Sequence, residues 1–277
     1  MPRAMWEGAV SFGLIVIPVK LYGATEPVDV PLHQVHGVDG GRIRYRRVCE
    51  ICGQEVPYDQ IDRGYTAADG RVVVLTKQDL EQLPLASKGT VEISTFVDES
   101  EIDPVYFEKT YLIEAKGVGV KPYVLLRDAL AKTGKAGVVK VALRTRESLA
   151  LIRPRGDLLV MDTMLWPDEV RDPSFAAPDT EVHASPAEVT MAETFIGQMS
   201  GHWEPSEYTD SYRAALEALV TAKLEGATVP EPVKTEGGGE VVDLMAALRA
   251  SVEAAKKRGH ASSGKSSGSD KDEAAAG

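Results

Sequence analysis

The 277-residue sequence has few of the features that mark secreted, membrane or disulfide-rich proteins. Its only two cysteines lie three positions apart, which does not make a disulfide framework. No apolar run approaches the roughly 18 residues that cross a bilayer, and the longest, residues 10–22, is interrupted by Gly13, Pro18 and Lys20. The start of the chain lacks the charged and then apolar layout of a signal peptide. We therefore expect a cytoplasmic protein, associated with the nucleoid if it binds DNA, and no membrane contact.

Motifs of catalysis and cofactor binding are missing as well. The chain contains no phosphate-binding loop, no Gly-x-Ser-x-Gly elbow and no His-Glu-x-x-His motif. Carboxylates are concentrated between residues 157 and 210, where twelve acidic residues accompany one basic residue. A solvated face explains such a concentration. We expect neither an enzyme active site nor a cofactor.

The basic residues are clustered within a chain whose net charge is −11. Residues 42–47 carry four arginines, and residues 140–155 carry five basic residues and one glutamate. A polyanion responds to the local field, so a basic lining on an acidic body can still bind it. Composition therefore permits a lined channel or groove for nucleic acid. The predicted DNA-binding residues are Lys20, Arg42, Arg44, Arg46, Arg47, Lys140, Arg144, Arg146 and Arg153.

The first basic cluster is predicted to be an extended strand. Side chains alternate along a strand, so Arg42, Arg44 and Arg46 would share one face at a spacing of about 6.6 Å, which resembles phosphate spacing. The alternative is a solvated edge strand on which arginine only prevents aggregation. The sequence contains no recognition helix and no pair of stacking aromatics on a strand. This favours sequence-independent contacts to the sugar-phosphate backbone of a nucleic acid.

Hydrophobic patterning predicts a β-rich body followed by helices. Residues 8–22 are interpreted as one long, bent strand, and the basic runs around residue 145 as a hairpin. Capping boxes predict helix starts at Thr76 and Ser185. A further helix is expected from about 210 to 225, with Gly226 as its stop. A helix opening at Pro122 is expected to present one apolar face made of Val124, Leu125, Ala129 and Leu130.

The motif Cys49-x-x-Cys52 followed by Gly53 is half of a zinc knuckle. A closed zinc site needs four ligands, and His33 and His36 could complete it, although a turn that has lost its metal is the alternative. Cys49 and Cys52 are therefore weak metal candidates, and a zinc- or thiol-dependent DNA-binding regulator stays open as a function. A second alternative is a lyase that attacks abasic DNA ends through Lys20 or Lys109.

Five separate segments resemble the bacterial Ku family, namely residues 6–22, 42–53, 101–104, 149–156 and 168–171. The resemblance covers about residues 2–228. It implies an α+β, mainly β fold, in which a β-barrel core carries an arched bridge around a broken DNA duplex. It also implies a non-enzymatic homodimer that binds double-strand DNA ends during non-homologous end joining and recruits the ATP-dependent ligase D. By position, the four arginines of residues 42–47 would lie in the bridge, and Arg144 and Arg146 in the DNA-facing part of the barrel.

Patterning and resemblance together divide the chain into five parts. These are a barrel domain over 1–170 with its bridge at about 33–64, a helical arm over 171–228, a linker over 229–239, an amphipathic helix over 240–258 and a disordered tail over 259–277. A body of about 230 residues has a radius of gyration near 17 Å, so a ring around a duplex requires two copies. The predicted ligase-binding residues are Val241, Leu244, Met245, Leu248 and Val252.

Overall fold

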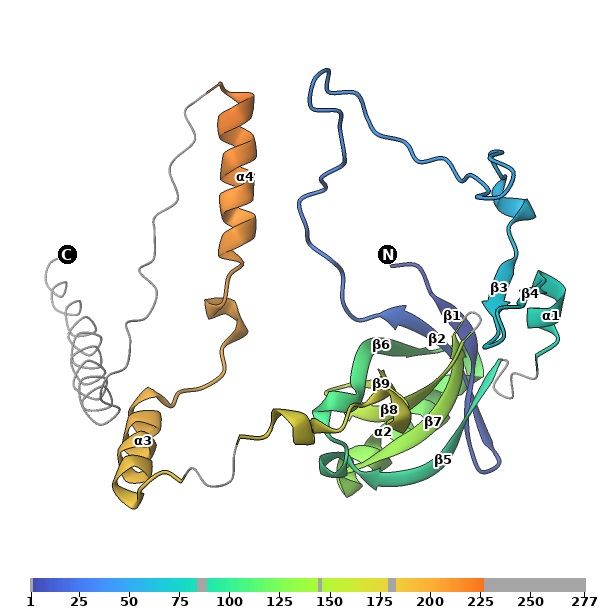
Figure 1. The fold of residues 1–277 in the computed structure, drawn as a ribbon. Coiled ribbons are helices and arrows are strands. Elements are labelled where there is room, and N and C mark those ends of the chain that lie inside the picture. Colours follow the sequence, from blue (N-terminus) through green and yellow to red (C-terminus); the bar gives the residue numbers. More distant parts are fainter. Residues whose placement is uncertain (1, 84–88, 144–145, 179–182, 227–277) are drawn as a thin grey trace, which may run out of the picture. The chain divides into compact units, whose positions relative to one another are not determined.

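The computed structural model describes residues 2–83, 89–143, 146–178 and 183–226. The chain divides into two units, residues 1–172 and 173–277. A closed barrel forms the core of the first unit, and the described part of the second contains two α-helices (Figure 1). The predicted α+β, mainly β fold is therefore confirmed. No helix within the described ranges is long and apolar enough to span a membrane.

The barrel closes through seven strands in the order β1-β2-β6-β9-β8-β7-β5. All neighbours are antiparallel except β1 and β5. Alternate residues of each strand face the interior, where Ile17, Val19 and Leu21 of β2 join an apolar core. The strands are β1 (Trp6–Phe12), β2 (Ile15–Gly23), β5 (Thr90–Asp98), β6 (Phe107–Ala115), β7 (Lys135–Leu143), β8 (Arg146–Arg155) and β9 (Leu158–Met164).

The long strand expected over residues 8–22 is wrong, because β1 and β2 form an antiparallel hairpin there. The chain reverses between Phe12 and Ile15, with Gly13 at a φ of 57°. Only glycine adopts this left-handed conformation without steric cost, so Gly13 permits a two-residue turn. The hairpin predicted near residue 145 is confirmed by the pairing of β7 with β8.

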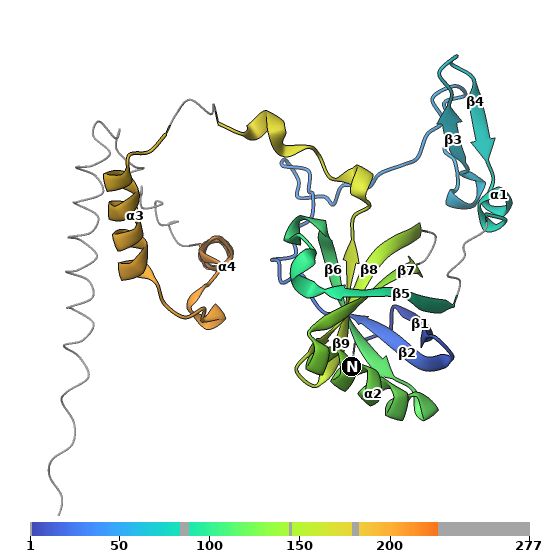
Figure 2. The same cartoon turned by 90° about the horizontal axis from the view of Figure 1, so that it is seen from below.

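Helix α2 (Val120–Thr133) packs against the barrel strands β2, β7 and β8 (Figure 2). Its first turn contains Pro122 as predicted, but the expected apolar face is largely wrong. The helix buries Tyr123, Leu126 and Leu130, whereas Leu125 is 57% exposed. The hydroxyl of Tyr123 donates to the Ile113 carbonyl at 2.9 Å and accepts from the Leu159 backbone N–H at 2.7 Å, so hydrogen bonds to the barrel select the buried face.

A second, smaller apolar cluster lies on Ala136, Leu151 and Met164 and also packs against Ile102 and Tyr106 of the segment between β5 and β6. Beside it, the carboxylate of Asp162, only 3% exposed, accepts hydrogen bonds from Arg153 Nε at 2.7 Å and Thr110 Oγ1 at 2.5 Å. Arg153 also reaches Glu99 at 3.4 Å. A buried carboxylate needs such partners to offset its lost hydration. Arg153 therefore has a structural role in the barrel.

Between β2 and β5 the chain forms a small hairpin of β3 (Arg63–Thr66) and β4 (Val72–Leu75), followed by α1 (Lys77–Glu81). The capping box predicted at Thr76 is present, since its hydroxyl accepts from the Asp79 N–H. The same threonine donates to Asp79 and holds the pKa of that carboxyl below its usual value. Neither strand buries a residue, and Val72, Val73 and Val74 are exposed.

The described part of the second unit contains α3 (Pro186–Met199) and α4 (Ser211–Leu224). The capping box at Ser185 is confirmed, and Asp210 caps the N-terminus of α4. Neither helix buries any residue. The predicted linker, amphipathic helix and tail lie outside the described residues, and so do the candidate ligase-binding residues Val241, Leu244, Met245, Leu248 and Val252.

Candidate nucleic-acid interface

The four clustered arginines lie in a long segment that leaves the barrel after β2 and returns through β3 (Figure 1). We call residues 42–47 the arginine segment. It connects two hairpin-like turns, one closed by the bridge between Val35 and Arg42 and the other by the bridge between Val48 and Glu55. No strand forms over the segment itself, so the predicted extended strand is wrong. Its ends pair within their own turns, and among the described residues no strand pairs with the segment to impose an alternation of faces.

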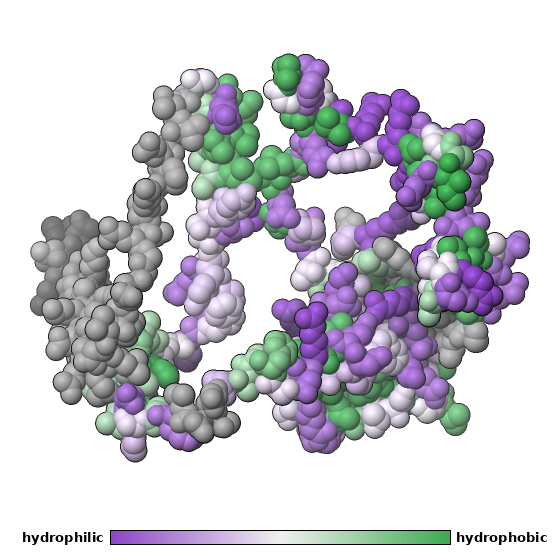
Figure 3. All heavy atoms as spheres, in the orientation of Figure 1, coloured by the Kyte–Doolittle hydropathy of each residue, from purple (hydrophilic) through white to green (hydrophobic). Residues whose placement is uncertain are grey.

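The side chains of the arginine segment are exposed, and hydrophilic residues cover much of the surface around it (Figure 3). Arg46 reaches Glu55 at 3.4 Å while remaining 78% exposed. The guanidinium of Arg47 lies 5.3 Å from the ring centroid of Tyr58, in a cation–π contact. Among the described residues, Arg42 and Arg44 have no ion-pair partner. Their charges are available to an external anion.

The second basic cluster is more strongly engaged within the protein. Lys140 lies over the ring of Trp166, 5.5 Å from its centroid, and Arg146 pairs with Glu169 at 2.5 Å. The pKa of Glu169 is lowered, first because the Trp166 backbone N–H donates to its carboxylate and then because of Arg146. Arg153 is held by Asp162, and Arg144 lies outside the described residues. The DNA contacts of this cluster stay predictions.

Lys20 has acidic neighbours. On β2 it lies opposite Glu7 of β1 and opposite Glu114 of β6. Glu7 pairs with Lys116, and its pKa is lowered mainly by that lysine and to a smaller extent by Lys20. Glu114 accepts a hydrogen bond from Tyr22 at 2.6 Å. The local field is therefore close to neutral, and the arginine segment offers a polyanion the stronger attraction.

Residues 11–191 of the chain match the family model of the Ku70/Ku80 beta-barrel domain. The chain is 48% identical over 263 residues to the non-homologous end joining protein Ku 2 of Saccharopolyspora erythraea, which covers 92% of this chain and 84% of the relative. The chain belongs to the Ku family. It is also 48% identical to the non-homologous end joining protein Ku of Frankia casuarinae, in an alignment that covers 92% of this chain but only 64% of that relative. It is 39% identical to the non-homologous end joining protein Ku of Mycobacterium tuberculosis, where the alignment covers 92% of this chain and 96% of the relative.

The cysteines of this Ku chain lie in the turn that follows the arginine segment. The Gly53 N–H donates to the Cys49 carbonyl at 2.8 Å, and Gly53 adopts a φ of 69°. His36 pairs with Asp39 at 3.0 Å. Within the described part of the chain, no group of three or more His, Cys, Asp or Glu residues lies together as a metal site would require. The proposed completion of a four-ligand site by His33 and His36 is therefore not seen.

Cys49 is expected to react faster than Cys52 with alkylating reagents. Backbone N–H groups of Cys52 and Ile51 donate to the Cys49 sulfur and lower the pKa of its thiol. A lowered pKa raises the thiolate fraction at neutral pH, and the thiolate is the nucleophile. Iodoacetamide labelling followed by peptide mass spectrometry should give Cys49 a lower pH midpoint than that of a free cysteine in a short peptide. Equal rates for the two cysteines at every pH would contradict the role of these hydrogen bonds.

Proposed function

We propose that this Ku protein is a homodimeric clamp that binds the ends of double-stranded DNA through the sugar-phosphate backbone, independently of sequence. We further propose that it acts in non-homologous end joining as a binding and recruitment factor, not as an enzyme. Relatives that are 39–48% identical are named non-homologous end joining proteins, which supports this role. The single observation that carries the proposal is the arginine segment, where exposed guanidinium groups lie on a chain with a net charge of −11.

The position of the arginines supports backbone binding. Arg42 and Arg44 lack ion-pair partners among the described residues, so a phosphate would not have to displace an internal carboxylate. An exposed arginine in a turn-rich segment can follow the phosphates of any sequence. The segment also lacks a helix that could enter the major groove and read bases. These features favour binding without sequence preference.

Exposed apolar surfaces support the homodimer. The valines of β4 are exposed on a two-stranded hairpin, which is marginally stable alone. Val189, Ile196 and Met199 of α3 are exposed as well, and neither arm helix buries a residue. Apolar surfaces of this kind are typical of protein interfaces, and a second copy of the chain would cover them on both partners at once.

The proposed recruitment of ligase D rests on the sequence of residues 240–258. Apolar residues recur there at helical spacing, and the run ends in Lys256, Lys257 and Arg258. An amphipathic helix attached through a glycine- and proline-containing linker is suited to bind a groove on a partner. The ligase is thus proposed to bind the chain beyond the arm and not the barrel.

Comparing linear with circular DNA tests the clamp. A closed ring of protein can load only where a duplex has a free end. In a competition assay against a labelled linear duplex, we therefore expect a covalently closed circle to compete for the protein at least about ten-fold less well than its linearised form. Non-specific contacts to cationic side chains account for the residual binding of the circle. About six phosphate contacts predict a log–log salt slope near −5. The control is the same circle cut once by a restriction enzyme. Equal competition by the circle and the linear duplex would reject end-specific binding.

A further inference from the structure

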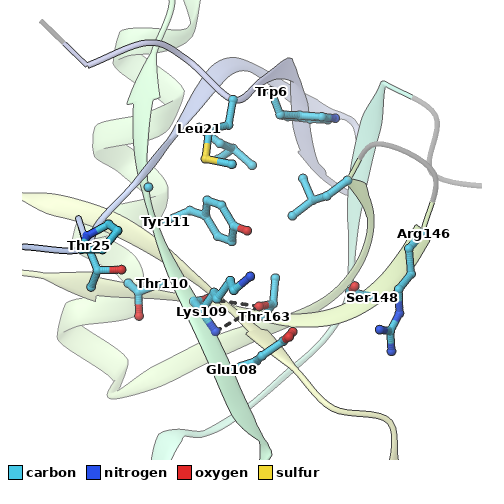
Figure 4. A pocket seen from close by; sticks show the side chains of 14 residues that line it. Trp6, Leu21, Thr25, Glu108, Lys109, Thr110, Tyr111, Arg146, Ser148 and Thr163 are labelled. Carbon is cyan, nitrogen blue, oxygen red and sulfur yellow. Dashed lines mark hydrogen bonds between the residues drawn. The ribbon is translucent and has the colours of Figure 1, made fainter. Parts of the chain in front are cut away.

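One end of the barrel contains a cavity of about 520 Å³ that the sequence did not indicate (Figure 4). Its inner wall is aromatic and apolar, with Trp6, Leu21 and Tyr111, and its other lining residues include Lys109, Arg146 and Thr163. In the close-up, Tyr111 lies between Leu21 and Lys109, Trp6 lies at the top of the view, and Arg146 lies at its right edge. The volume falls within the range of small-molecule sites, and the mouths of β-barrels are a common place for them.

The strand pattern explains how polar groups come to line this cavity. Inward-facing residues of β6, β8 and β9 are apolar along most of each strand, with Ile113, Ile152 and Leu159 in the core. Continuing the same alternation toward the cavity leads to the polar residues Lys109 on β6, Ser148 and Arg146 on β8, and Thr163 on β9. Three strands therefore exchange apolar for polar side chains at the same end of the barrel.

Specific contacts hold the cavity walls in place. The register of β6 against β9 shifts between Phe107 and Lys109, and Thr163, itself 3% exposed, both accepts from the Lys109 N–H and donates to the Lys109 carbonyl at 3.2 Å. A bulge of this kind re-aims the neighbouring side chains. On the opposite wall the ring of Trp6 lies against Gly8, where a Cβ atom would collide with it. The site is therefore formed before any ligand arrives.

Charge and aromatic groups together define the class of ligand. Aromatic side chains stack with nucleobases, and Lys109, which has no ion-pair partner among the described residues, is a cation that suits a phosphate. Arg146 lines the same cavity but is paired with Glu169, and Glu108 lines the cavity as well. One available cation fits one phosphate group better than a polyphosphate. We propose that the barrel mouth binds a single nucleotide, with its base against Trp6 and Tyr111 and its phosphate at Lys109.

Two sources can supply this chemistry, a free mononucleotide or the terminal nucleotide of a DNA end. For the first, we propose titrating the full-length protein with AMP by calorimetry, with adenosine and ribose 5-phosphate as partial ligands. We expect one AMP per chain and a loss of about ten-fold or more in affinity for either fragment. Lys109→Gln and Trp6→Leu should each weaken AMP about ten-fold, whereas the matched controls Lys121→Gln and Trp203→Leu should not. Lys109 is exposed, so its variant tests the site even where the Trp6 variant fails to fold.

For the second source, the probe is a linear duplex with 2-aminopurine as its 5′-phosphorylated terminal base. A fluorescence change on binding that Lys109→Gln abolishes would assign the site to the DNA end, and AMP binding without this change would assign it to free nucleotide. Either result supports the proposal. No saturable AMP binding together with no change at the DNA end would overturn it, and so would equal affinities in the Lys109 and Lys121 variants. The AMP titration contains no DNA, so its outcome is independent of whether the protein clamps DNA ends.

Discussion

Reversing the charges at Arg42 and Arg44 is expected to weaken binding to every DNA duplex by about a thousand-fold at 0.1 M salt. Under the proposed function, the double variant Arg42→Glu with Arg44→Glu would remove two phosphate contacts per chain, and four from the proposed homodimer. Each phosphate contact contributes about −0.9 to the slope of log affinity against log salt concentration. Four contacts therefore correspond to a change of about 3 to 4 in this slope, and to the expected thousand-fold loss of affinity. Fluorescence anisotropy at several salt concentrations measures both quantities.

Three comparisons make this prediction specific. Lys121→Glu with Lys132→Glu on α2 changes the net charge by the same amount and should leave most of the affinity intact. Arg42→Lys with Arg44→Lys should also bind well, because a phosphate contact needs a point charge and no base-reading geometry. Two duplexes of different base composition should lose affinity equally. A loss confined to one sequence would show that the arginines read bases, and an unchanged affinity would remove the arginine segment from the interface.

Replacing Asp162 with alanine is expected to lower the free energy of unfolding by about 3 kcal/mol. The carboxylate is buried and accepts hydrogen bonds from Arg153 and Thr110, so its removal leaves a half-buried guanidinium and a threonine hydroxyl without their main acceptor. Urea denaturation of the full chain, followed by tryptophan fluorescence, gives the change. The expected mechanism is loss of a buried ion-pair partner and not loss of packing volume.

A matched pair of variants separates these causes. Glu99 contacts the same arginine from the surface, so Glu99→Ala should change stability by less than about 1 kcal/mol. Asp162→Leu combined with Arg153→Met replaces both charges with apolar groups of similar size and should recover most of the loss. If Asp162→Ala were as harmless as Glu99→Ala, the buried pair would not stabilise the barrel. The double variant also shows whether DNA binding needs the charge of Arg153, which stays a prediction.

Local sequence signals predicted the elements whose determinants lie within a few residues. The capping boxes at Thr76 and Ser185 and the stop at Gly226 depend on neighbours three or four positions away, and all three appear in the structure. The hairpin around residue 145 was equally readable, and it appears as the antiparallel pairing of β7 with β8. The buried face of α2 was not, because the hydrogen bonds of Tyr123 reach Ile113 and Leu159, 10 and 36 residues away.

The sequence selected the residues of the candidate site but did not contain their geometry. Four arginines within six positions predict an anion-binding segment from composition alone. The predicted arrangement of these arginines on one face of a strand was wrong. The segment forms no strand, and its ends close two separate turns. The engagement of Arg146 with Glu169 and of Arg153 with Asp162 was also missed, since residues 9 to 23 positions apart meet only after the barrel has closed.

The amino-acid sequence by itself determined the family, the mainly β fold, the helix caps and the uneven distribution of positive charge, because each depends on residue identity or on short-range spacing. The tertiary structure alone decided which basic residues stay available to an external anion and which neutralise a carboxylate of the protein. It also created the cavity at the barrel mouth, where Trp6, Lys109 and Arg146 come together only through strand pairing. The physical reason is that charge pairing and cavity walls depend on distances in space, which the order of residues along the chain does not contain.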